Sequence, residues 1–137
     1  MIANIRAAII QYLLTQENIT DICQTRIYAE IPATDASPVI APIVVVSEAG
    51  GSRKAGGYTK WHSATIEIWT YARSPSEASD LFGVIRASLK NMRRNIKAET
   101  LLHGADITSG AVSGRDAKTD WPFTWGSFDV FTSEEYQ

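Results

Sequence analysis

The chain has 137 residues, a formal net charge of −2 and 45% hydrophobic residues, values that suit one globular domain with its own core. The near-neutral balance argues against general attraction to nucleic acid, and the single cysteine, Cys23, excludes a disulfide within the chain. No run approaches the ~18 apolar residues of a membrane span. The N-terminal segment also lacks the features of a signal peptide, so we expect the protein to stay in the cytoplasm of the cell that makes it.

The first half of the chain predicts one helix followed by three strands. Apolar residues spaced three and four apart predict an amphipathic helix over residues 2–14. A short strand is expected over residues 26–31, and the valine-rich run 43–46 predicts a buried central strand. Residues 61–72 alternate in character and predict a long strand. The last two strands would form a hairpin whose tip is a glycine-flanked basic loop, residues 49–58.

The second half predicts a capped helix and two further strands. Ser74, Pro75 and Glu77 form a capping box with proline at the first helical position. The helix is expected to run to about Asn91, with a buried face made of Ala78, Leu81, Phe82, Ile85, Leu89 and Met92. A weaker strand is predicted over 105–112, a polar loop over 113–120 and a last strand over 121–131.

These elements predict one α+β domain over residues 1–137. Their order is α-β-β-β-α-β-β, and we expect two helices packed on a mostly antiparallel sheet. In the long strand, Trp69 and Tyr71 lie opposite the face that carries Ile66 and Ile68. The aromatic face is therefore either covered by helices or exposed to a partner.

No pattern in the sequence predicts catalysis, and we expect the protein not to be an enzyme. His62 is expected in a strand and His103 in a turn, and no zinc-binding motif contains either. The glycines around Arg53 do not form a phosphate-binding loop, because a strand and not a helix follows. Asp116 and Asp120 are expected in one polar loop, where exposure to solvent explains them better than a role as paired acid–base carboxylates. The sequence predicts no catalytic residue, no cofactor site and no metal site, and Cys23 is expected to be a buried apolar filler.

Charge is distributed unevenly along the chain. Residues 1–50 carry a net charge of −3, residues 51–100 carry +5 and residues 101–137 carry −4. These charges either interleave in space and cancel, or they meet across subunits. Basic and aromatic residues near the predicted loop leave single-stranded nucleic acid as a less favoured alternative partner.

Four segments in order resemble the tail-completion and tail-terminator proteins of long-tailed phages and related gene-transfer particles. They are TRIYAEIPA at 25–33, PIVVVSEAGG at 42–51, ATIEIWTYARSPSEASDLFGVIRASL at 64–89 and TDWPFTWGSFDVF at 119–131. Each motif alone is weak, but the four occur in the family's order and spacing, and the resemblance spans most of the chain. The sequence departs from the resemblance after Leu89, where it is more basic and less clearly patterned.

The resemblance implies a virion protein of the tail or neck. Such a protein forms a ring, commonly of six identical subunits, that caps the tail tube, ends its growth and joins it to the head connector. The implied partners are other copies of the chain, the tail tube protein and the head–tail connector proteins, with no membrane and no cofactor. Genome DNA would pass through the ring without specific binding. The alternatives are a neck adaptor that contacts the portal side and DNA, and a small enzyme or ligand-binding domain.

Two sets of residues are predicted to form the interfaces of such a ring. One set combines basic and aromatic side chains: Arg53, Lys54, Tyr58, Trp69, Arg93, Arg94 and Trp125. In the other, the basic stretch 86–97 of one subunit faces acidic residues of the next, drawn from Asp116, Asp120, Asp129 and Glu134–Glu135. The loop over 49–58 is expected to become ordered only on assembly.

Overall fold

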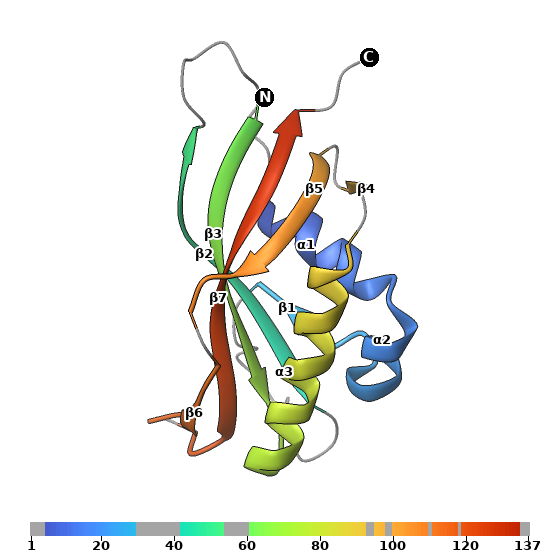
Figure 1. Cartoon of the computed structure of the whole chain (residues 1–137). Helices are drawn as coiled ribbons and strands as arrows, with labels where there is room; N and C mark the ends of the chain where they lie inside the picture. The colour runs from blue at the N-terminus through green and yellow to red at the C-terminus, as the bar shows by residue number, and fades with distance from the viewer. Residues whose placement is uncertain are drawn as a thin grey trace.

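Within the described part of the chain, three helices pack on one face of a seven-stranded sheet (Figure 1). The computed structural model describes residues 5–29, 42–53, 61–92, 95–97, 100–109, 111–117 and 119–134. The helices are α1 (Ile5–Leu14), α2 (Glu17–Cys23) and α3 (Pro75–Lys90). The strands are β1 (Ile27–Tyr28), β2 (Ile43–Arg53), β3 (Trp61–Tyr71), β4 (Asn95–Lys97), β5 (Thr100–Ile107), β6 (Val112–Arg115) and β7 (Pro122–Glu134). The predicted fold class, α+β with a mostly antiparallel sheet, is confirmed.

The sheet has the order β1-β2-β3-β7-β5-β4, and β6 also pairs with β7. Only β1 and β2 are parallel among the described pairs. β3 occupies one edge of β7 from Phe123 to Ser133, so β5 and β6 must share the other edge. β6 pairs with the start of β7 and β5 with its end. β7 is therefore the central strand of the fold.

Helix α3 begins where the capping box predicts. Ser74 has an extended backbone, and its hydroxyl accepts a hydrogen bond from the Glu77 amide at 3.3 Å. The Glu77 carboxylate does not complete the box, because it accepts from Arg73 Nε at 2.9 Å instead. All six residues expected on the buried face of the helix are buried.

The main core lies between the helices and the sheet. Ile66 and Ile68 of β3 are fully buried against it, as the alternation predicts. Tyr12 joins two helices, since its hydroxyl donates to the Ser88 carbonyl at 2.9 Å. At Gly126 of β7 the helix comes unusually close to the sheet. A Cβ there would lie 2.7 Å from Cζ of Phe82, so a glycine is required for α3 to pack at this distance.

The structure corrects the prediction in the first half of the chain. Helix α2 was not expected, because its seven residues include β-branched types and Gln16 supplies no side-chain cap. Burial of Ile19 and Cys23 holds it in place. The segment 49–58 was predicted as a loop, yet β2 continues to Arg53, because β3 supplies hydrogen-bonding partners after a bulge beside Glu48. The remainder of that loop, residues 54–60, lies outside the described residues.

The second half also differs in detail. The strand predicted over 105–112 is two strands, β5 and β6, so the expected loop over 113–120 begins as a strand. His103 is not in a turn but in β5, at a bulge between Leu102 and Gly104. His62 lies in β3 and Cys23 is fully buried, as expected. Within the described residues, each helix falls short of what a membrane crossing demands in length and apolar character.

Candidate interaction surfaces

A row of aromatic side chains lies on the face of the sheet that points away from the helices, which we call the outer face. The aromatic patch consists of Trp69, Tyr71, Trp121, Phe123 and Trp125. Trp69 lies directly opposite Trp125, and Tyr71 directly opposite Phe123, on neighbouring antiparallel strands. Such cross-strand aromatic pairs stabilise a sheet beyond the area they bury.

The patch is anchored at its base and open at its surface. Tyr71 is buried and packs with Ile43 and Val45, while both tryptophans of the β3–β7 pair remain half-buried. Val112 of β6, opposite Trp125, is 49% exposed. None of the helical residues of the main core belongs to this second cluster. The outer face thus presents apolar surface of the kind that interfaces use.

Three carboxylates lie beside the aromatic patch on the same face. Asp129 of β7 is directly opposite Asp106 of β5, and Glu67 of β3 is a diagonal neighbour of Asp129. The Thr65 hydroxyl donates to Asp129 Oδ1 at 2.9 Å and so fixes that carboxylate. We call Glu67, Asp106 and Asp129 the acidic band. Like charges in adjacent strands repel one another, so a cation from elsewhere would relieve this repulsion.

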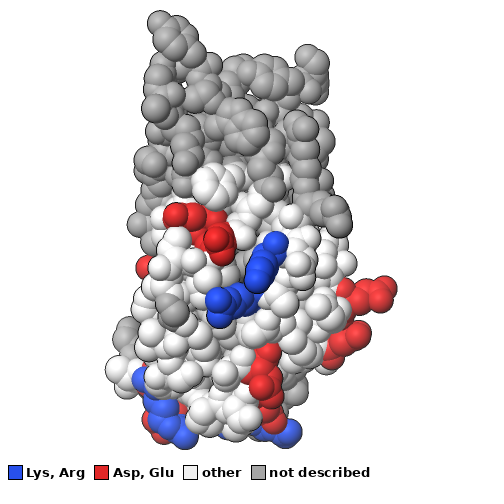
Figure 2. Space-filling view, in the orientation of Figure 1, with Lys and Arg blue, Asp and Glu red and all other residues white. Residues whose placement is uncertain are grey.

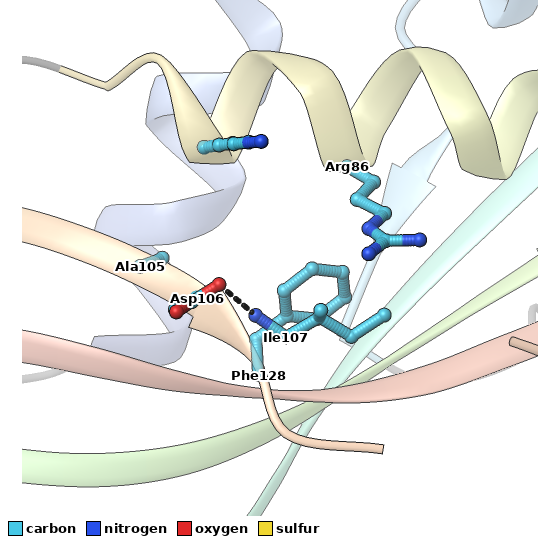
Figure 3. A pocket seen from close by; sticks show the side chains of 6 residues that line it. Arg86, Ala105, Asp106, Ile107 and Phe128 are labelled. Atoms are coloured by element: carbon cyan, nitrogen blue, oxygen red, sulfur yellow. Dashed lines mark hydrogen bonds between the residues drawn. The ribbon is translucent and has the colours of Figure 1, made fainter. Parts of the chain in front are cut away.

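A basic pocket lies between α3 and β5, on the helix side of the sheet. Arg86 and Lys90, one helical turn apart, border a pocket of ≈ 60 Å³. Ala105, Ile107 and Phe128 form its apolar lining, and Figure 3 shows Arg86 extending from α3 toward the last two. This volume matches about two water molecules. The pocket could therefore accept one small side-chain group but not a nucleotide or an organic cofactor.

The two basic side chains have no ion-pair partner among the described residues. Asp106 also borders the pocket, but its Oδ1 accepts from the Ile107 amide at 2.9 Å. In the view of Figure 2, a group of acidic side chains lies to the upper left of a group of basic ones. Both charge groups are thus accessible from outside the subunit.

The described residues contain no cluster of three or more side chains suited to hold a metal ion. Burial raises the pKa of the Cys23 thiol to about 11, so it is a protonated and unreactive group at neutral pH. Burial, with a smaller contribution from the Asp116 carboxylate, raises the pKa of Tyr71 to about 12. Neither group is therefore prepared to act as a nucleophile or a base.

The structure brings together only part of the predicted interface. Trp69 and Trp125 stack with ring centroids 5.4 Å apart. Arg53 lies at the end of β2, but its side chain is outside what the structure describes. The remaining four predicted residues, which are Lys54, Tyr58, Arg93 and Arg94, lie outside the described residues.

The predicted acidic partners differ in the contacts that they make within the subunit. Asp116 accepts hydrogen bonds from the Thr119 amide and hydroxyl at 2.9 and 2.8 Å, and Asp120 pairs with Arg115 at 3.6 Å. Asp129 faces outward in the acidic band. Glu134 ends β7 without a described side chain, and Glu135 lies outside the described residues. Glu67 and Asp106 were not predicted as partners, because their proximity to Asp129 depends on strand register.

No protein-family model matches the chain, and a search of the curated proteins finds no match. Among solved structures, a chain from a structure described as "Virion of native gene transfer agent (GTA) particle" is similar. The two share 14% sequence identity, with a TM-score of 0.70, and the match covers 93% of each chain. A likeness at this identity shows a common fold over nearly the whole length of both chains.

Proposed function

We propose that this protein is a structural component of a tailed-phage-like particle that forms a ring on the end of the tail tube. The ring would end tube growth and join the tail to the head connector. The observation that carries the proposal is the shared fold with a chain of a gene transfer agent virion, over 93% of both chains. The order of sequence motifs, which resembles tail-terminator proteins, supports the same role independently of the structural match.

Two features of the surface also support a role in assembly over a role in catalysis. The outer face carries a half-buried aromatic patch that no described helix covers. The described pocket between α3 and β5 has a volume of ≈ 60 Å³, room for about two waters, which is far below the ≈ 300–1,000 Å³ typical of ligand sites. The protein is therefore proposed to act through interfaces with other proteins and without a cofactor.

The test is to delete the gene from the particle's genome and image the products by electron microscopy. A protein that ends tube growth should leave tails of irregular and excessive length that lack heads. Restoring the chain in trans should restore uniform tails, and a tagged copy should localise to the junction between tail and head. Tails of normal length that fail to join heads would indicate a neck adaptor, and unaltered infectious particles would contradict both roles.

A further inference from the structure

The outer face of the sheet has two chemical halves that a single partner could cover. Strand pleating places Trp69 and Glu67 on the same face, two residues apart, and places Trp125 and Asp129 beside them on β7. The apolar half, around Trp69 and Trp125, would be stabilised by a partner surface that excludes water. The acidic half, around Glu67 and Asp129, would be stabilised by cationic groups. A complementary partner would therefore present both apolar and basic groups.

The helix side of the same subunit presents those groups. Arg86 and Lys90 are exposed, lie one turn apart and have no ion-pair partner among the described residues. They stand over the apolar lining of the pocket, so cationic and apolar atoms occur together. Exposed Leu14 and Ile22 add apolar area to the helical layer.

Glu67 and Asp129 lie on the opposite face of the sheet from Arg86 and Lys90, and the two surfaces adjoin at β5, where Asp106 borders the basic pocket. Glu67 and Asp129 alternate with residues that face the helices, so their side chains point away from α3. Among the described residues no ion pair joins Arg86 or Lys90 to Glu67 or Asp129 within the subunit, so these charges are available to successive copies. A contact between two different patches of identical chains is heterologous, the type that closes a cyclic ring.

We propose that a second copy of this chain occupies the outer face, with its Arg86 and Lys90 facing Glu67 and Asp129 and its helical layer covering Trp69 and Trp125. This inference rests on the proposed function, because the contact that it assigns is the one that would close the ring. Of the basic stretch 86–97 that was predicted to face the next subunit, the proposal uses only Arg86 and Lys90, whose surroundings the structure describes. It does not use Asp116 and Asp120, because each already has a partner within its own subunit.

Complementary charge reversal tests the contact in the full-length chain. The variant Arg86→Glu/Lys90→Glu makes the helix side acidic, and Glu67→Lys/Asp129→Lys makes the outer face basic. Each variant alone would place like charges in contact, so self-association, measured by sedimentation and native mass spectrometry, should weaken by about tenfold or more at low salt. Mixed in equal amounts, the two variants should associate again, in oligomers with equal numbers of each. The control Arg73→Glu/Arg115→Glu makes the same change in net charge as Arg86→Glu/Lys90→Glu, at sites outside both surfaces, and should associate like the wild type.

The outcomes separate this contact from the proposed function. The contact is wrong if either reversal leaves association unchanged, if the mixture stays dissociated, or if the wild type is monomeric at millimolar concentration. A mixture that stops at one-to-one dimers would also overturn it, because a two-fold contact would then replace the ring contact. The proposed function fails separately, if purified particles lack the protein while the charge reversals behave as expected. Thermal unfolding of each variant checks that the fold is retained.

Discussion

Trp69 and Trp125 face each other across the β3–β7 pair and stack, with ring centroids 5.4 Å apart and an interplanar angle of 21°. Phe123 extends the contact, with its ring centroid 5.1 Å from that of Trp69. The pair joins the two central strands on the outer face, while the helices cover the other. Its contribution to folding is thus separable from that of the main core.

A double-mutant cycle measures the interaction energy between Trp69 and Trp125. Trp69→Ala and Trp125→Ala should each lower the free energy of unfolding, and the double variant should lose less than their sum. We expect a coupling energy of about 0.5–1.5 kcal/mol, measured by urea unfolding. Additive losses would show that the stacked geometry contributes nothing beyond buried area.

The main core gives larger effects. Ile66→Ala and Leu81→Ala each remove a fully buried side chain between β3 and α3, and each should cost about 2–5 kcal/mol of unfolding free energy. The exposed Leu14 provides the control, because Leu14→Ala should cost far less. A loss below about 0.5 kcal/mol at both buried sites would mean that the assigned core is wrong.

The close approach of α3 to β7 predicts opposite results at two glycines. Gly126→Ala should destabilise the protein by about 1–3 kcal/mol, because its Cβ would meet the buried Phe82 ring at 2.7 Å. Adding Phe82→Leu should recover part of that loss. Gly83→Ala is the matched control. Apart from its chain neighbours and the backbone of its own helix, no heavy atom lies within 4 Å of a Cβ at Gly83. A helix interior favours alanine by about 1 kcal/mol, so this variant should be more stable than the wild type. Equal effects at the two positions would contradict the packing.

Alkaline pH should destabilise the fold through Cys23 and Tyr71. Below pH 9 the thiol is protonated in both the folded and the unfolded chain, and its contribution is fully present. Between its ordinary pKa of 9.0 and the folded value of about 11, only the unfolded chain loses the proton, so the free energy of unfolding falls as pH rises. Tyr71 adds the same effect between 10.0 and about 12.

The measurement is the pH dependence of unfolding by urea from pH 8 to 11. Each group can contribute a slope of at most about 1.4 kcal/mol per pH unit. The variant Cys23→Ala should show a shallower fall between pH 9 and 11 than the wild type. Parallel curves for the two proteins would show that the thiol does not retain its proton in the folded state.

Long periodic elements could be predicted from the sequence, and short ones held by contacts could not. Local sequence signals specify these long elements: the cap at Ser74 marks the start of helix α3, and the alternation around Ile66 indicates strand β3. Helix α2 lacks a side-chain cap, and β6 consists of four largely exposed residues paired only with β7 among the described strands. For such elements, tertiary contacts outweigh local propensity.

The same distinction applies to the candidate surfaces. The alternation of β3 placed Trp69 and Glu67 on one face, and the sequence could predict that face as an interface. The acidic band could not be predicted, because it depends on Asp106 and Asp129 meeting through the register of β5 and β7. The basic pocket likewise depends on how α3 lies over Phe128.

The central position of β7 has a consequence for how fast the chain reaches its folded state. β2 and β3 are consecutive strands and can pair early, but β7 must find β3 across a long stretch of intervening sequence. Closing such a loop costs entropy before the contacts compensate for it, which slows folding. Until β7 inserts, the edges of β3 and β5 stay unpaired and open to strands of other chains. Refolding yield should therefore fall with protein concentration, and variants that weaken β7 should increase that loss first.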